Sequence, residues 1–97
     1  MMTIDEIKEK STEVFDEYPV GTVMLFGSYA TGTQTEISDV DMIIKNSDLG
    51  ILEMSRMRQQ LASVLEKRID LVSEDDLSDV FRFLIHDEEV LIYEKQR

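Results

Sequence analysis

Apolar residues recur along the chain at two spacings, and the changes between them predict where helices give way to strands. In residues 3–18 they fall three or four positions apart, which is typical of an amphipathic helix, and a Thr3-x-x-Glu6 capping box marks its start. Pro19 ends this helix, because the residue before a proline avoids helical geometry. Short apolar runs between turn residues predict strands. The elements expected are a helix at 3–18, strands at 22–26 and 39–45, a helix at 49–67, a strand at 68–72, a helix ending near 85 and a strand at 89–93.

This order predicts an α/β, or α+β, architecture in which one small mixed β-sheet has helices packed mainly on one face. Ser73-x-x-Asp76 is expected to cap the last helix. Its apolar residues are expected on one helix face, and they are Leu77, Val80, Phe81, Leu84 and Ile85. A chain of 97 residues can bury one modest core, so residues 1–97 are expected to form a single domain without a separate substrate-binding domain.

The chain is strongly acidic, with 21 Asp and Glu against 10 Lys and Arg and a formal net charge of -11. Phosphate contacts need a basic face, so this charge argues against direct nucleic-acid binding and against an anionic membrane surface. It suits a basic partner or metal ions. No stretch approaches the roughly 20 apolar residues of a membrane span, and the first residues do not form a secretory signal. Because cysteine is absent, a reducing cytoplasm is the default compartment.

The candidate chemistry lies between the first two predicted strands, in the stretch FGSYATGTQTEISDVDMIIK at residues 26–45. Gly27 and Ser28 directly follow a buried strand. Glycine there lets a ligand approach the backbone, and serine offers a hydroxyl and an N–H group to phosphates. Asp39 and Asp41 begin the next strand, where alternation points both side chains to the same face. Two carboxylates on one face make a candidate divalent-cation site.

Asp70 supplies a third carboxylate in the next predicted strand. It interrupts an apolar run at residues 69–72, where a buried charge is costly unless it is paired, hydrogen-bonded or bound to metal. The alternative is an edge-strand residue that pairs with Lys67 or Arg68. Phosphates at the glycine–serine turn, Mg²⁺ at the aspartate pair and a third carboxylate nearby form the layout of two-metal phosphoryl or nucleotidyl transfer.

The motif spacing resembles that of a known family. Gly27-Ser28, ten residues, Asp39, one residue and Asp41 are similar to the G-S-x10-D-x-D signature of the nucleotidyltransferase superfamily related to DNA polymerase β. The short chain and the aspartate of the third predicted strand resemble the minimal nucleotidyltransferase (MNT) group in particular, over residues 22–93. The resemblance implies the nucleotidyltransferase fold.

The resemblance also implies an ATP-dependent transferase that uses two Mg²⁺ ions. Gly27 and Ser28 would hold the triphosphate, and Asp39 and Asp41 would ligate the metals. Asp70 would ligate the catalytic metal and assist deprotonation of the acceptor hydroxyl. Stand-alone MNT proteins are often antitoxins of HEPN toxins, which are helical RNases with a basic active site, and members with an intact motif can transfer AMP to a toxin tyrosine. A HEPN-type toxin is therefore the implied partner, in a hetero-oligomer.

One position departs from the family pattern, because many members carry Ala-Arg-Gly where this chain has Ala30-Thr31-Gly32. The missing arginine would offer charge to the phosphates or support to the loop, so the departure bears on turnover more than on the fold. Tyr29 and Thr31 are expected to be exposed loop residues. His86, the only histidine, is expected near a helix end, where the helix dipole favours a cation.

Three functions remain open from the sequence. The first is an adenylyltransferase antitoxin that modifies a hydroxyl of its toxin. The second is a catalytically silent antitoxin that masks a basic toxin, which the charge of -11 and the absent arginine favour. The third is a small-molecule nucleotidyltransferase that works with a separate helical subunit.

Overall fold

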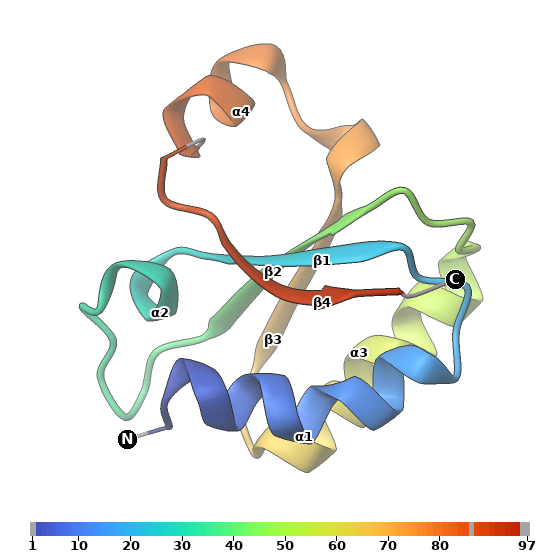
Figure 1. The fold of residues 1–97 in the computed structure, drawn as a ribbon, viewed down its shortest axis with the longest axis horizontal. Helices are drawn as coiled ribbons and strands as arrows, with labels where there is room; N and C mark the ends of the chain where they lie inside the picture. The colour runs from blue at the N-terminus through green and yellow to red at the C-terminus, as the bar shows by residue number, and fades with distance from the viewer. Residues whose placement is uncertain (1, 86, 96–97) are drawn as a thin grey trace.

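A four-stranded mixed sheet organises the chain in the computed structural model, which describes residues 2–85 and 87–95 (Figure 1). The strands lie in the order β3-β2-β1-β4. The elements along the chain are α1 (Ile4–Asp16), β1 (Thr22–Phe26), α2 (Ser28–Thr31), β2 (Val40–Lys45), α3 (Ile51–Leu65), β3 (Ile69–Ser73), the 3₁₀ turn η1 (Glu74–Asp76), α4 (Asp79–Ile85) and β4 (Val90–Glu94).

The sheet combines both kinds of strand pairing. β1 runs antiparallel to both β2 and β4, whereas β2 and β3 are parallel and are joined through α3. A parallel pair needs such a crossover connection, and a helix usually supplies it. The predicted small mixed sheet is confirmed, with β3 and β4 as its edges.

α1 and α3 pack side by side on one face of the sheet (Figure 1). The capping box predicted for α1 is present, because the Glu6 N–H donates to Thr3 Oγ1 at 3.1 Å and the Thr3 N–H donates to Glu6 Oε1 at 3.4 Å. The core lies between these helices and the sheet, since alternate residues of the central strands are buried there. Its central-strand members are Val23, Leu25, Val40, Met42 and Ile44.

The segment between β3 and β4 differs from the prediction of one helix capped by Ser73. Ser73 Oγ accepts the Asp75 N–H at 3.4 Å, but the turn that it caps is η1, and the chain becomes extended at Leu77. α4 begins afterwards, where Ser78 Oγ accepts the Phe81 N–H at 3.1 Å. This short helix stands on the other side of the sheet from α1 and α3 (Figure 1).

The apolar stripe predicted for this last helix is mostly outside the core. Ile85 is buried, whereas Val80 and Leu84 are 70% and 66% exposed. A stripe at helical spacing predicts a helix with an apolar face, but it does not decide whether the protein itself covers that face. His86 lies outside the described residues.

Candidate active site

The face of the sheet turned away from α1 and α3, called here the open face, carries a row of site residues. Phe26 of β1 pairs in register with Asp41 of β2, and Asp41 pairs with Asp70 of β3. Directly paired residues on neighbouring strands point to the same face. Leu25 and Met42, the next paired positions, are fully buried on the core side. Phe26, Asp41 and Asp70 therefore lie side by side across three strands.

Asp39 and Asp41 flank a core residue. Val40 between them is fully buried, whereas both aspartates are only half-buried, so their side chains lie on the side away from the core. β2 begins at Val40, one residue later than predicted, and Asp39 immediately precedes it. The Val40 N–H donates to the Arg68 carbonyl oxygen at 2.9 Å, which continues the pairing of β2 and β3 to this end of the sheet.

The three aspartates influence one another electrostatically. Burial raises the pKa of the Asp41 carboxyl above its ordinary value, and the negative charges of Asp70 and then Asp39 raise this pKa further. Asp41 is therefore the centre of an acidic cluster in which each ionised neighbour disfavours its charged form. A divalent cation beside Asp41 would offset this repulsion.

The donor set fits a cation that is shared with a bound nucleotide. Among the described residues, no three acidic or histidine side chains are arranged to hold a metal ion by themselves. Mg²⁺ does not require such a cage, because it usually keeps several waters and is bound by one or two carboxylates together with substrate phosphates. Asp39 and Asp41 match this requirement, and the phosphate oxygens of a bound nucleotide would supply further ligands.

Gly27 brings the glycine–serine turn directly against this cluster. Its φ of 73° and ψ of -152° favour glycine, and a Cβ at this position would lie 2.4 Å from Asp41 Oδ2. The sequence predicted that this glycine lets a ligand approach the backbone. The structure shows that the Asp41 carboxylate itself makes the close approach. A phosphate bound at the turn would consequently lie beside the carboxylate.

Ser28 begins the single-turn helix α2 and is half-buried. In the part of the chain that the structure describes, its hydroxyl makes no hydrogen bond, so it can donate to a ligand. Thr31, at the position of the family arginine, is exposed as predicted. Its hydroxyl donates to the Gly27 carbonyl oxygen at 3.2 Å and lies 3.0 Å from Thr33 Oγ1. Thr31 therefore supports the turn by hydrogen bonds and brings no charge to it.

Tyr29 contradicts the prediction of an exposed loop residue. Its side chain is only 1% exposed and belongs to the core cluster, so it anchors α2 to the body of the protein. Its hydroxyl has no hydrogen-bond partner among the described residues. The available signal was its large aromatic ring three residues after a buried strand, where a short helix can turn one side chain inward.

Asp70 is exposed, which differs from the buried position that the apolar run suggested. It lies on the edge strand β3, and within the described ranges no ion pair involves it, so the alternative of pairing with Lys67 or Arg68 is not observed. Lys67 instead donates to the Glu36 carbonyl oxygen. The Asp70 carboxylate is open to a ligand or to an incoming acceptor.

Sequence reasoning missed three further contacts around the site. The ring of Phe81 in α4 meets the ring of Phe26 edge-on, with centroids 6.0 Å apart and an interplanar angle of 88°. Lys45 Nζ lies 3.1 Å from Glu89 Oε2 and 3.9 Å from Glu74 Oε1, so β2 holds both ends of the segment that contains α4. No local sequence signal indicated these contacts, because each joins residues far apart in the chain.

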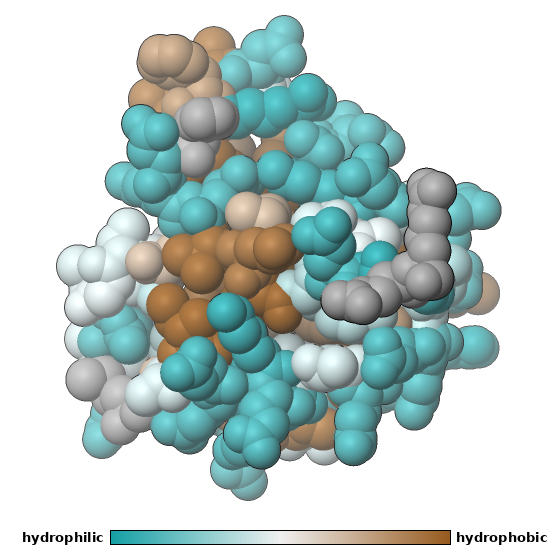
Figure 2. All heavy atoms as spheres, in the orientation of Figure 1, coloured by the Kyte–Doolittle hydropathy of each residue, from teal (hydrophilic) through white to brown (hydrophobic). Residues whose placement is uncertain are grey.

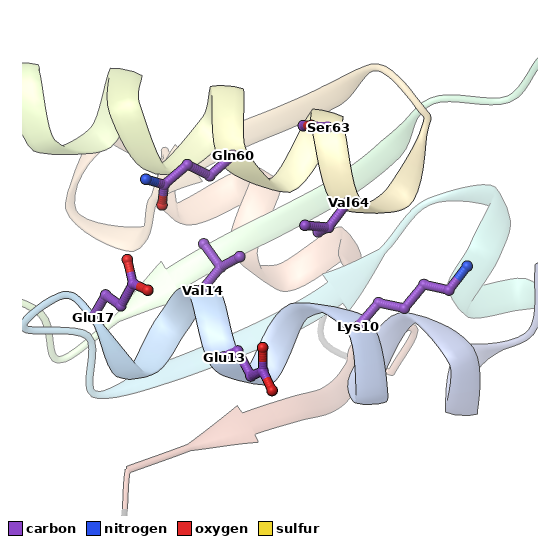
Figure 3. A pocket seen from close by; sticks show the side chains of 7 residues that line it. All are labelled: Lys10, Glu13, Val14, Glu17, Gln60, Ser63 and Val64. Carbon is purple, nitrogen blue, oxygen red and sulfur yellow. The ribbon is translucent and has the colours of Figure 1, made fainter.

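A hollow lies on the opposite side of the molecule from this site, between α1 and α3 (Figure 3). It has a volume of about 280 Å³ and contains none of the predicted site residues. Its lining consists of Lys10, Glu13, Val14, Glu17, Gln60, Ser63 and Val64.

Residues 9–97 match the family model described as Polymerase beta, Nucleotidyltransferase. The chain belongs to this nucleotidyltransferase family. It is 30% identical over 82 residues to a protein of Thermococcus cleftensis named protein adenylyltransferase MntA. The aligned region covers 79% of this chain and 83% of that protein. The family resemblance inferred from the glycine–serine and aspartate motifs is confirmed.

Solved structures agree with the family assignment. The fold matches one chain of a toxin–antitoxin crystal structure with AMP-PNP, with a TM-score of 0.77 and 27% identity over 92% of this chain and 74% of that chain. The fold alone is also shared with a chain in the structure of a tri-AMPylated Shewanella oneidensis HEPN toxin in complex with MNT antitoxin, with a TM-score of 0.72, 22% identity and coverage of 97% and 75%. Among the described residues, no helix has the length and apolar character needed to cross a membrane.

Proposed function

We propose that this chain is an antitoxin that transfers AMP from ATP to a hydroxyl group, that of a tyrosine, on a HEPN-type toxin. The observation that carries the proposal is the position of Asp41, which lies between Asp39 and Asp70 and against the backbone of Gly27. Residues 1–97 act as a single MNT domain in the cytoplasm, in a hetero-oligomer with the toxin. The relatives support this choice, because one is named a protein adenylyltransferase and another is part of a toxin–antitoxin structure with an ATP analogue.

The proposed reaction assigns a role to each site residue. Asp39 and Asp41 would hold two Mg²⁺ ions, and Asp70 would be a further ligand of one of them. Bound Mg²⁺ neutralises phosphate charge and favours the deprotonated form of the acceptor hydroxyl. Gly27 leaves room for the triphosphate at the turn, and Ser28 donates its hydroxyl proton to a phosphate oxygen.

Asp70 accepts the proton of the acceptor hydroxyl. The acceptor oxygen then forms a bond to the α-phosphorus of ATP, the bond from that phosphorus to the bridging oxygen breaks, and pyrophosphate leaves. The exposure of Asp70 on an edge strand supports an acceptor on another molecule, because a separate protein can reach this carboxylate without opening the fold.

The test is incubation of the protein with labelled ATP, Mg²⁺ and the HEPN-type protein encoded beside it. We expect label on the toxin with the wild-type protein and none with the Asp39→Ala/Asp41→Ala double variant. The matched control is Asp48→Ala, which removes an exposed acid distant from the motif. Absence of label with the wild-type protein would reject the enzymatic proposal.

The second candidate is a catalytically silent antitoxin that masks a basic toxin. The net charge of -11 and the uncharged Thr31 in the phosphate turn favour it. The same double variant separates the two candidates in an assay of toxin activity. If the variant still binds the toxin but no longer neutralises it, masking is insufficient, whereas retained neutralisation supports masking.

A further inference from the structure

α4 presents a compact apolar surface to solvent. Val80, Phe83 and Leu84 are 70%, 81% and 66% exposed, although they lie within five consecutive positions of one short helix. Hydrophobic residues gather over α4 at the top of the molecule, next to strongly hydrophilic ones (Figure 2). We call these three side chains the α4 patch. Large apolar side chains clustered in water are typical of a surface that another molecule covers.

The opposite side of α4 attaches the patch to the candidate active site. Phe81 is half-buried and meets Phe26 edge-on with a centroid separation of 6.0 Å, and Ile85 is buried. Phe26 is the register partner of Asp41 on the open face. α4 therefore packs over the same face of the sheet as Asp41 and Asp70, and a molecule that covers the α4 patch is anchored to this helix.

The segment that carries the patch is acidic. The segment from η1 to the start of β4 contains seven acids, against Arg82 as its one Lys or Arg. Glu74 and Glu89 pair with Lys45 of β2, so the segment still has an excess of acids over bases. The Arg82 side chain is also engaged, because its Nη2 donates to the Leu77 carbonyl oxygen at 3.3 Å. The acids of the segment are Glu74, Asp75, Asp76, Asp79, Asp87, Glu88 and Glu89.

An apolar centre with a charged rim is the usual composition of a protein–protein interface. The acids of this segment favour an occupant of opposite charge, which is a surface that carries Lys and Arg around an apolar centre. A second copy of this chain would instead oppose a net charge of -11 with the same charge.

We propose that the α4 patch is the docking surface for the protein that supplies the acceptor hydroxyl, through an apolar surface ringed by Lys and Arg. The inference rests on the proposed function for the existence of a protein acceptor. Docking on α4 anchors the acceptor beside Asp41 and Asp70, so the patch contributes to acceptor affinity and not to the chemistry of transfer.

The test compares two double variants that each remove a pair of exposed apolar side chains. Phe83→Ser/Leu84→Ser disrupts the patch. The matched control, Ile51→Ser/Leu52→Ser, removes side chains that are 89% and 71% exposed at the start of α3. Because all four side chains are exposed, we expect both variants to keep the wild-type circular dichroism spectrum. The probe is the HEPN-type protein encoded beside this chain, measured by titration calorimetry.

We expect the patch variant to bind the probe about tenfold or more weakly, as is typical when interface anchors are removed, and the control to change affinity less than about twofold. In the transfer assay the patch variant should raise the KM for the acceptor and keep the kcat at saturation. Its affinity for AMP-PNP with Mg²⁺ should equal that of the wild type.

Wild-type affinity of the patch variant for the probe would overturn the docking proposal. So would a wild-type dimer in sedimentation that the patch variant abolishes, because a second copy would then be the occupant. If the wild-type protein binds the probe and transfers no AMP, the proposed function fails, while the affinities still decide the docking proposal. If AMP is transferred with an unchanged KM in the patch variant, the function stands and the docking surface is rejected.

Discussion

The backbone of Gly27 lies against the carboxylate of Asp41, so that a Cβ at Gly27 would stand 2.4 Å from Asp41 Oδ2. This contact joins the two halves of the sequence motif, which are fourteen positions apart in the chain. The proposed phosphate-binding turn and the proposed metal-binding carboxylate are therefore in direct contact, so a change in one is expected to disturb the other.

We expect Gly27→Ala to damage both the fold and the activity. The positive φ of 73° already disfavours alanine, and the Cβ would displace the Asp41 carboxylate. Gly32→Ala is the matched control, because Gly32 has a φ of 78° and nothing within 4 Å of a Cβ. The control should lose about 1–2 kcal/mol of unfolding free energy, the cost of left-handed backbone, and keep its activity. Gly27→Ala should lose more and also lose AMP transfer; equal activity in the two variants would contradict the importance of the contact.

Asp41→Asn should stabilise the metal-free protein while abolishing its activity. The raised pKa of Asp41 means that the folded state holds this proton more tightly than the unfolded chain does, so folding stability falls as the pH rises from 3.8 through the folded pKa. Asparagine carries no charge, so the variant avoids this loss of folding stability at neutral pH.

Thermal unfolding in EDTA at pH 7 should give a higher Tm for Asp41→Asn than for the wild type, and transfer should fall about 100-fold or more. Asp48→Asn, at an exposed position distant from the site, serves as the control and should change neither value. A lower Tm for Asp41→Asn would argue against repulsion at the site.

Tyr93 should titrate late and stabilise the fold through Asp16. Its hydroxyl donates to Asp16 Oδ1 at 2.7 Å, and burial together with this hydrogen bond and the Asp16 charge raises the pKa of Tyr93 to about 12. The stabilisation is complete below pH 10.0, the ordinary tyrosine value, and is lost as the pH rises to about 12.

Tyr93→Phe should lower the unfolding free energy by about 1 kcal/mol at pH 7. Absorbance of tyrosinate should lose the transition near pH 12 in this variant. Tyr18→Phe, which removes a hydrogen bond to Gln60 Oε1 of 3.0 Å, is the control and should keep that transition.

Lys45→Met should loosen the segment that carries α4. The substitution keeps an apolar stem and removes the charge that holds Glu89, in a pair whose side chains are 23% and 14% exposed. We expect a loss of about 1 kcal/mol, smaller at high salt, and faster proteolysis between β3 and β4. Lys95→Met, at an exposed position near the C-terminal end of β4, should leave proteolysis unchanged. Equal cleavage of both variants would show that the Lys45 pair does not restrain the segment.

Local features of the chain were predictable from the sequence because they depend on neighbouring residues. The capping box of α1, the strand at Thr22–Phe26 and the placement of Asp39 and Asp41 on the same side of the sheet all follow from short-range spacing. The motif spacing likewise identified the family, since the glycine–serine turn directly follows one strand and the aspartate pair lies at the start of the next.

Tertiary structure alone decided how these pieces meet. The pairing of Asp41 with Asp70 depends on the parallel register of β2 and β3, which the crossover of residues 46–68 through α3 sets. The burial of Tyr29 and the contact of Phe81 with Phe26 depend in the same way on packing between distant segments. Side-chain spacing specifies which face of a helix or strand is apolar, but only the register and packing of the whole chain determine what that face meets.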